Sequence, residues 1–154
     1  MTDAGQFPVI QVAVTIVERA GFYLVEYNPK WESFSLPMAR QRRHLVTGVA
    51  VTETAEMAAV RAAAKALGRP LSAAQFPHRV HLLSPYARLR SGRDGKTKDY
   101  RYGVFAMRVS DPVVSHSLGW HTLWMRPADL ATPVPVSETV TLLLKHLPED
   151  LFAE

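Results

Sequence analysis

One helix-forming segment stands between runs of strand-forming residues, and this order constrains the fold more than any other feature of the sequence. The segment covers residues 54–67 and is rich in alanine. Thr54 can cap its first turn, and Gly68 followed by Pro70 ends it. One face of this helix carries four apolar residues that we expect to be its buried stripe: Met57, Val60, Ala64 and Leu67.

Strand-like runs lie on both sides of this helix. Residues 8–17 and 22–27 precede it, and residues 18–21 between them read as a turn, which predicts a hairpin. Residues 28–47 form an arginine-rich stretch that we expect to be irregular. Two alternating segments follow the helix and are expected to be strands, 78–84 and 100–109. Residues 120–125 are expected to form a further short strand.

Two shorter helical segments are expected near the end of the sequence. Residues 127–130 read as a helical turn, and residues 137–147 as a helix that Ser137 caps and Pro148 stops. Strands that bracket one central helix, with a second helix after them, indicate an α+β domain with a mixed sheet and helices packed on it. We expect residues 1–7 to be a flexible tail and 8–154 to form a single domain.

The composition is that of a soluble globular protein and sets limits on its chemistry. Of 154 residues, 47% are hydrophobic and 21% are charged. The absence of cysteine excludes disulfides and thiolate metal sites. The sequence shows neither a signal peptide nor a membrane-spanning run, so we expect a cytoplasmic location with no membrane partner. The formal net charge of +4 permits an anionic partner.

A spaced motif overlaps the central helix. Glu53 and Arg61 are separated by seven residues, a small pair at 58–59 precedes the arginine, and Gly68 follows. This pattern resembles the box of the Nudix (MutT-like) superfamily, which runs G-x5-E-x7-R-E-U-x-E-E-x-G-U, where U is a bulky aliphatic residue. Two flanking segments also resemble that family: Trp31 with Leu36-Pro37 before the box, and residues 124–130 (WMRPADL) after it.

The resemblance covers roughly residues 8–147 and implies the Nudix fold, a mixed β-sheet sandwiched between α-helices. Glu53, Arg61 and Gly68 are then structural remnants of the box. In the family the arginine usually pairs with the box glutamate, so the resemblance implies an ion pair between Arg61 and Glu53.

The three helix glutamates of the box are replaced in this sequence. Ala62, Lys65 and Ala66 stand at their positions, and Arg69 stands where an aliphatic residue is expected. The first box glycine falls on Thr47, and the longer spacing before Glu53 implies an insertion around 40–46. The resemblance is therefore to a degenerate Nudix box.

The replaced glutamates bear directly on metal binding. Family members resemble one another in using them to hold Mg²⁺ or Mn²⁺ against a diphosphate. A hard cation needs oxygen ligands, which alanine does not supply, and the charge of a lysine repels it. We therefore expect no metal site and no metal cofactor, and with them the loss of metal-assisted hydrolysis.

Basic residues take the place of the acidic ones. Arg61, Lys65 and Arg69 recur every four residues, which predicts a basic row along the helix. Such a row is compatible with a solvated surface or with an anion site in which Lys65 replaces the cation. We name five candidate ligand-binding residues: Arg61, Lys65, Arg69, Arg40 and Arg42.

Two functions from different classes remain open. The first is a catalytically degenerate domain that binds a nucleotide-type anion or a protein partner in a regulatory role. The alternative is a divergent hydrolase that cleaves a nucleoside diphosphate-linked substrate with Mg²⁺ held by Glu53 and Glu56. Arginines, lysines and tyrosines between 86 and 102 permit nucleic-acid binding, but the modest net charge does not favour it. A homodimer is compatible with the sequence.

Overall fold

The computed structural model describes residues 7–29, 32–80, 86–90, 95–110, 116–117, 120–130, 136–148 and 151–152. The expected tail lies outside this part except for Phe7, and so does Trp31.

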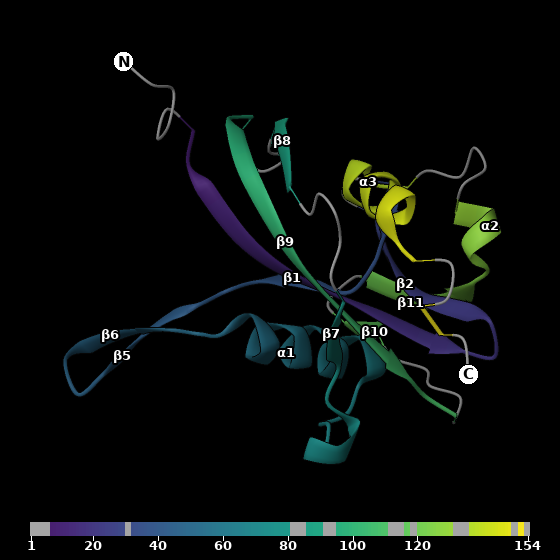
Figure 1. Cartoon of the computed structure of the whole chain (residues 1–154), viewed down its shortest axis with the longest axis horizontal. Helices are drawn as coiled ribbons and strands as arrows, with labels where there is room; N and C mark the ends of the chain where they lie inside the picture. The colour runs from purple at the N-terminus through teal and green to yellow at the C-terminus, as the bar shows by residue number, and fades with distance from the viewer. Residues whose placement is uncertain are drawn as a thin grey trace.

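Most of the described strands form one mixed sheet of nine strands (Figure 1). Its main path runs β10-β11-β2-β1-β9-β7, while β3, β4 and β8 pair with β2, β1 and β9. The central strands β1 and β9 are parallel, and the other pairs are antiparallel. The strands are β1 (Val9–Arg19), β2 (Phe22–Asn28), β3 (Ser33–Ser35), β4 (Met38–Arg40), β7 (His78–Val80), β8 (Tyr86–Arg90), β9 (Thr97–Arg108), β10 (His116–Ser117) and β11 (Trp120–Met125).

The expected hairpin between the first two strands is confirmed, but its turn is tighter than predicted. Arg19 pairs directly with Phe22, so the turn consists of Ala20 and Gly21 alone. Both residues have positive φ, 53° and 87°. This is the geometry of a two-residue turn whose twist matches that of the flanking strands. Glu18 and Arg19 therefore belong to β1 and not to the turn.

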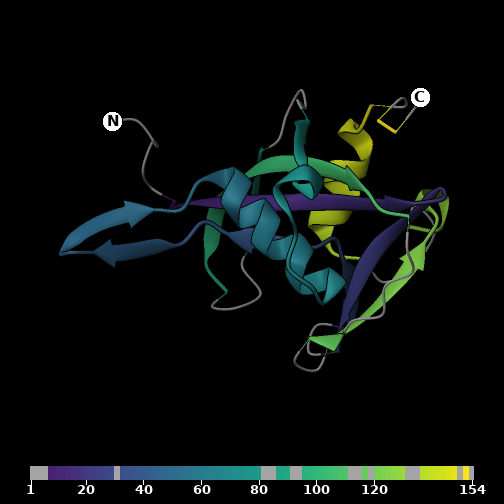
Figure 2. The same ribbon diagram turned by 90° about the horizontal axis from the view of Figure 1, so that it is seen from below.

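The prediction that residues 28–47 are irregular was wrong. They contain β3, β4 and β5 (Arg43–Val46), and β5 pairs with β6 (Val49–Thr52) in a separate two-stranded sheet. This β5–β6 hairpin extends away from the main body in both views (Figures 1 and 2). Segments of three or four residues are too short to show an alternation in the sequence, so the sequence did not predict them. They form strands because a neighbouring strand offers hydrogen bonds.

The expected helices are confirmed, and so are their caps. They are α1 (Ala55–Leu67), α2 (Pro127–Leu130) and α3 (Glu138–His146), with a short 3₁₀ turn η1 (Ala73–Gln75) after α1. The Thr54 hydroxyl accepts from the Met57 N–H, and the Ser137 hydroxyl accepts from the Val140 N–H. Gly68 ends α1 at a left-handed φ of 71°. None of the described helices is long and apolar enough to cross a membrane.

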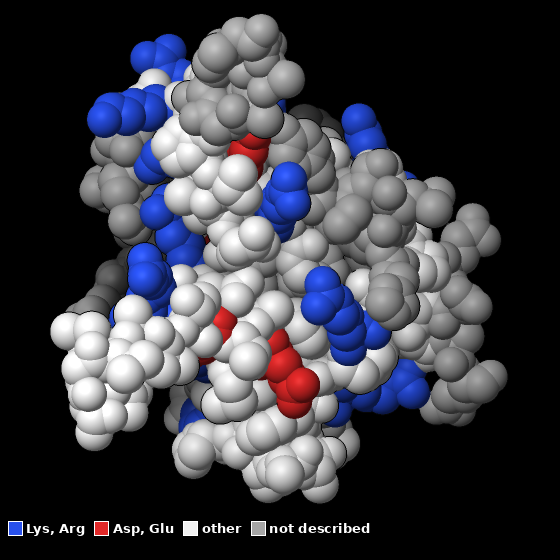
Figure 3. Space-filling model, turned by 60° about the vertical axis from the view of Figure 1, so that its left-hand side comes forward, with Lys and Arg blue, Asp and Glu red and all other residues white. Residues whose placement is uncertain are grey.

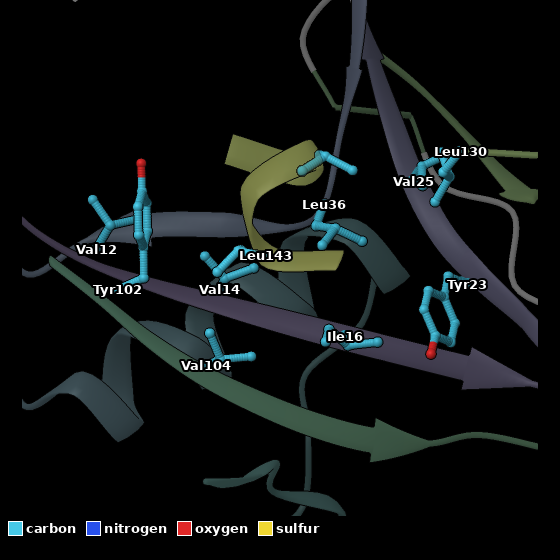
Figure 4. Close-up of a cluster of buried hydrophobic side chains, with 11 residues drawn as sticks. Val12, Val14, Ile16, Tyr23, Val25, Leu36, Tyr102, Val104, Leu130 and Leu143 are labelled. Carbon is cyan, nitrogen blue, oxygen red and sulfur yellow. The ribbon is translucent and has the colours of Figure 1, made fainter. Parts of the chain in front are cut away.

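The sheet lies between α1 on one face and α3 on the other, which confirms the α+β architecture (Figure 2). Successive residues of β1 point to opposite faces. Val12, Val14 and Ile16 pack in the core cluster that contains Val140 and Leu143 of α3 (Figure 4). The intervening residues face α1: Ala13 packs with Ala58 and Ala59, and Val17 packs with Ala63 and Leu67.

The predicted buried stripe of α1 was largely wrong. The side chain of Met57 is 47% exposed, and Val60 and Ala64 are half-buried. The residues that α1 buries are Ala58, Ala59, Ala62, Ala63, Ala66 and Leu67. A face of small side chains lets the helix backbone approach the sheet closely enough for the Thr15 hydroxyl to donate to the Ala59 carbonyl at 2.9 Å. The small size of these side chains, which permits close approach to the sheet, therefore selects the buried face.

This face predicts that enlarging one of its alanines is more costly than truncating Met57. Ala63 packs against Val17, Leu24 and Met107, so Ala63→Leu should overpack the core. We expect a loss of about 1–3 kcal/mol in the free energy of unfolding. Met57→Ala should change it by no more than about 0.5 kcal/mol. Urea unfolding measures both, and the reverse order would contradict the observed packing.

Candidate functional site

The ion pair implied for Glu53 and Arg61 is present in the structure. Nη2 of Arg61 donates to Oε1 of Glu53 at 2.8 Å, and Nε donates to Oε2 at 3.2 Å. The Glu53 carboxylate is largely buried and the Arg61 side chain is half-buried. Such a two-pronged contact fixes the guanidinium in one orientation. Arg61 is therefore committed to a structural contact at the start of α1.

The same pair holds the segment between β4 and β5 against the helix. Arg61 Nη2 also donates to the carbonyl of Arg40 at 2.8 Å. The Arg42 N–H donates to Glu53 Oε1 at 3.1 Å, and the Glu53 N–H donates to the Arg42 carbonyl at 2.6 Å. The Gln41 side chain donates to the Glu53 carbonyl at 2.7 Å. The predicted residues Arg40, Arg42, Glu53 and Arg61 thus meet at one place.

The contacts in this cluster lower the pKa of its carboxyl group. The hydrogen bond from Arg61 holds the pKa of Glu53 below its usual range, and the Arg42 backbone N–H and the charges of both arginines act in the same direction. Burial alone would raise that pKa, so the bonds outweigh it. Glu53 is therefore an anion already engaged with cations.

The three positions at which the resemblance to the Nudix box implies glutamates differ in their surroundings. Ala62 and Ala66 are buried, and Ala66 packs with Val17 and Leu24. Lys65 is exposed in the last turn of α1, where the helix dipole favours a positive charge. Two of the positions therefore contribute apolar packing, and the third contributes a cation.

The predicted basic row does not extend to Arg69. The N–H groups of Gly68 and Arg69 donate to the carbonyls of Lys65 and Ala64, which is the hydrogen-bond pattern of a Schellman cap. The left-handed conformation of Gly68 turns the chain off the helix before Arg69. Arg69 is half-buried beyond the helix end, so it does not continue the line from Arg61 to Lys65.

The remaining carboxylates of the described residues do not form a metal site. No group of three or more His, Asp or Glu side chains gathers anywhere in that part of the chain. Glu56 is exposed in the first turn of α1, and Asp99 is paired with Arg88 at 2.6 Å. Mg²⁺ takes six oxygen ligands and is usually held by one or two carboxylates together with waters or substrate phosphates, and Ala62, Lys65 and Ala66 supply no carboxylate. The residues present at the box positions therefore do not fit Mg²⁺.

Gln41 and Glu26 were missed from the sequence. Gln41 reaches the cluster only because of the fold, and no sequence signal marks it. Glu26 is a buried carboxylate on β2, and alternation places it on the same face as Leu24, which packs against α1. A charged residue within the apolar run of β2 is the signal that could have marked Glu26.

Much of the basic and aromatic run near residue 100 is occupied in other contacts. Arg88 pairs with Asp99, and Arg90 donates to the carbonyl of Gly95 at 2.8 Å. Lys98 and Tyr102 are buried. Lys and Arg are nevertheless spread over the face shown in Figure 3, with few acidic groups among them.

The cluster around Glu53 predicts a measurable loss on neutralising that residue. Glu53→Gln leaves Arg61 half-buried without a counter-charge and should cost about 1.5–3 kcal/mol at pH 7. Because the folded-state pKa is lowered, this stabilisation is present above the ordinary carboxyl range and disappears as the pH falls through the folded value. Urea unfolding at pH 7 and pH 3 should thus show a difference from wild type that shrinks in acid. Glu56→Gln is the exposed control, and an equal effect of both would contradict this account.

Comparisons with known proteins bear on the fold. No family model matches the sequence, and no curated protein matches it. Solved structures do match. A MutT protein from Methanosarcina mazei superposes with a TM-score of 0.67 at 11% identity, covering 91% of this chain and 93% of that one.

Two further structures agree with the first. A Nudix hydrolase from M. smegmatis gives a TM-score of 0.56 at 21% identity, covering 92% of this chain and 83% of its own. An Ap4A hydrolase from C. elegans gives 0.54 at 20% identity, covering 89% and 95%. The arrangement expected from the spaced motif is confirmed, and the chain has the Nudix fold.

Proposed function

We propose that this chain is a catalytically degenerate Nudix-fold domain that binds a nucleotide-type anion in a regulatory role. One observation carries the proposal: the charges of Arg42 and Arg61 both act on a single carboxylate, Glu53, at the start of α1, and the backbone of Arg40 is held beside them by Arg61. Two cations around one anion leave an excess of positive charge there. Phosphate groups are the anions that arginine recognises best, because its donors match pairs of oxygens.

The exposed side chains in and beside the cluster are the ones that can contact the ligand. Arg61 is held by Glu53, so its role is to position the segment around Arg42. Arg42 makes its hydrogen bonds to Glu53 through backbone groups, its charge also acts on Glu53, and the residue is exposed. Arg42 and the exposed Lys65 are therefore the side chains we propose for phosphate binding.

The residues at the box positions also support binding without hydrolysis. Alanines at 62 and 66 supply no oxygen ligand and are packed in the protein, and Lys65 adds a positive charge. A cationic side chain can neutralise a phosphate but does not generate a nucleophilic water as a bound metal ion does. We propose that the charge once supplied by a metal is supplied here by side chains.

The nucleotide class comes from the proteins whose folds are similar. One of them is described as an Ap4A hydrolase. Dinucleoside polyphosphates and ADP-ribose carry several phosphates close together and suit a short cluster of cations. These compounds are the first ligands to test.

Thermal unfolding in metal-free buffer tests the proposal. A ligand at about 100 times its dissociation constant adds about 2.7 kcal/mol, which raises the Tm of a domain of this size by roughly 5–10 °C. We expect Arg42→Glu and Lys65→Glu each to weaken binding at least about tenfold. Lys145→Glu makes the same charge change at an exposed residue of α3, which lies across the sheet from α1, and this variant should retain binding. No shift with Ap4A, ADP-ribose or a mononucleotide would refute the proposal, and so would equal losses in all three variants.

The competing function is a divergent hydrolase that uses Glu53 and Glu56 with Mg²⁺. It is favoured by the fold similarity to structures described as hydrolases and by the survival of these two carboxylates. Product release from the same nucleotides is measured with Mg²⁺ and with EDTA. Turnover that EDTA and Glu56→Gln both abolish would establish the hydrolase and overturn the degenerate assignment.

A further inference from the structure

The β5–β6 hairpin exposes an unusual amount of apolar surface. Within the described part of the chain, seven large hydrophobic residues are strongly exposed, and four of them lie on this hairpin. Leu45 is 79% exposed, Val46 53%, Val49 61% and Val51 45%. Contiguous exposed apolar residues on a soluble domain are typical of an interaction surface.

The pairing of the hairpin places three of these residues together. Val46 pairs with Val49 and Leu45 pairs with Ala50. Paired residues share a face and neighbours alternate, so Val46, Val49 and Val51 lie on one face and Leu45 on the other. His44 pairs with Val51 and shares the face of the three valines, which we call the valine face. Its valines are β-branched, and such side chains pack well on a pleated surface.

The hairpin is also incomplete as a folded unit. Among the described strands, β5 and β6 pair only with each other. Two strands alone are marginally stable in water, and a further layer packed on their apolar face is the usual remedy. Figures 1 and 2 show the hairpin extending beyond α1 with its tip away from the main sheet. Its valine face therefore lacks the second layer that would bury it.

We propose that the valine face packs against the valine face of a second copy of this chain, forming a dimer with twofold symmetry. Charge points to this occupant. The valine face carries no lysine, arginine or carboxylate, and His44 is its one titratable residue, although the chain as a whole carries a net charge of +4 with histidine neutral. Two copies with the same net charge repel each other, and a face without formal charge at neutral pH is where they can approach. A strongly acidic partner would be matched by a face that carries arginine or lysine.

Self-association also fits the geometry. A twofold dimer places the same patch on both sides of the interface, so a face of three valines beside one histidine can be complementary to itself. The area is small, which puts the expected dimer at the weak end of specific interfaces, with a dissociation constant in about the micromolar range. This inference concerns the hairpin and does not depend on the anion site.

Sedimentation equilibrium of the full chain over a wide concentration range tests the dimer. We expect a reversible monomer–dimer equilibrium that Val49→Lys weakens at least about tenfold, because two lysines would be buried at the interface. Mixing Val49→Lys with Val49→Glu should restore association, since opposite charges then meet. Leu45→Lys places the same charge on the opposite face of the same hairpin and should change the dissociation constant by less than about threefold.

Three results would overturn the inference. A wild-type chain that stays monomeric throughout the range has no such interface. If Val49→Lys leaves the dimer intact, the dimer uses another surface. If Leu45→Lys weakens the dimer as strongly as Val49→Lys does, the interface is not the valine face. A monomer that co-sediments with phosphatidylserine-containing vesicles, and loses this with Val49→Lys, would assign the hairpin to a membrane surface instead.

Discussion

The two-sided burial of β1 is the constraint on which the rest of the structure depends. From Val12 to Glu18 every residue of this strand is buried, and alternate side chains serve the two helical layers. On one side the strand meets large aliphatic residues of α3, and on the other it meets the alanines of α1. Because the alanines are small, α1 lies closer to the sheet than a helix with large side chains could. The segment that leads into α1 must therefore also lie close to the sheet. Glu53 and Arg61 fasten that segment, so the candidate site is a consequence of how β1 is covered.

The same packing explains why alanine suits positions 62 and 66, where the resemblance to the Nudix box implies glutamates. A carboxylate at position 62 or 66 would sit on a buried surface and would need a metal ion or a cationic partner to offset its desolvation. Alanine needs neither and improves the contact with the sheet. Glu53, Arg61 and Gly68, which the resemblance aligns with the box, organise the backbone around the start and end of α1. At positions 62, 65 and 66 the chain carries small or positive side chains.

The sequence predicted the elements whose signals are local. Strand-like runs identified β1, β2 and β11, alternation identified β9, and Thr54, Gly68 and Ser137 marked the helix ends. The Glu53–Arg61 pair was implied by the resemblance to the Nudix box, and the structure contains it. The β5–β6 hairpin was missed because Thr47-Gly48 forms its turn in place of the more familiar Asn-Gly, with Thr47 at a φ of 47° that β-branched residues rarely adopt. The buried face of α1 was missed because alanine occurs both in the interior and on the surface of proteins. Which alanines are buried depends on the neighbouring sheet, which the sequence of the helix does not show. Arg69 was misplaced because the row of basic residues crosses a helix end.

The parallel pairing of β1 with β9 has a consequence for how the chain is made. Val9 is partnered by Asp99, ninety positions later. At about 5–20 residues per second, a ribosome needs roughly 5 to 18 seconds to deliver the second strand after the first. During that interval the most apolar strand of the protein can pair on one side only, with the nearby β2 or β4. The nascent chain should therefore depend on chaperones until β9 emerges, and native structure should appear late and all at once.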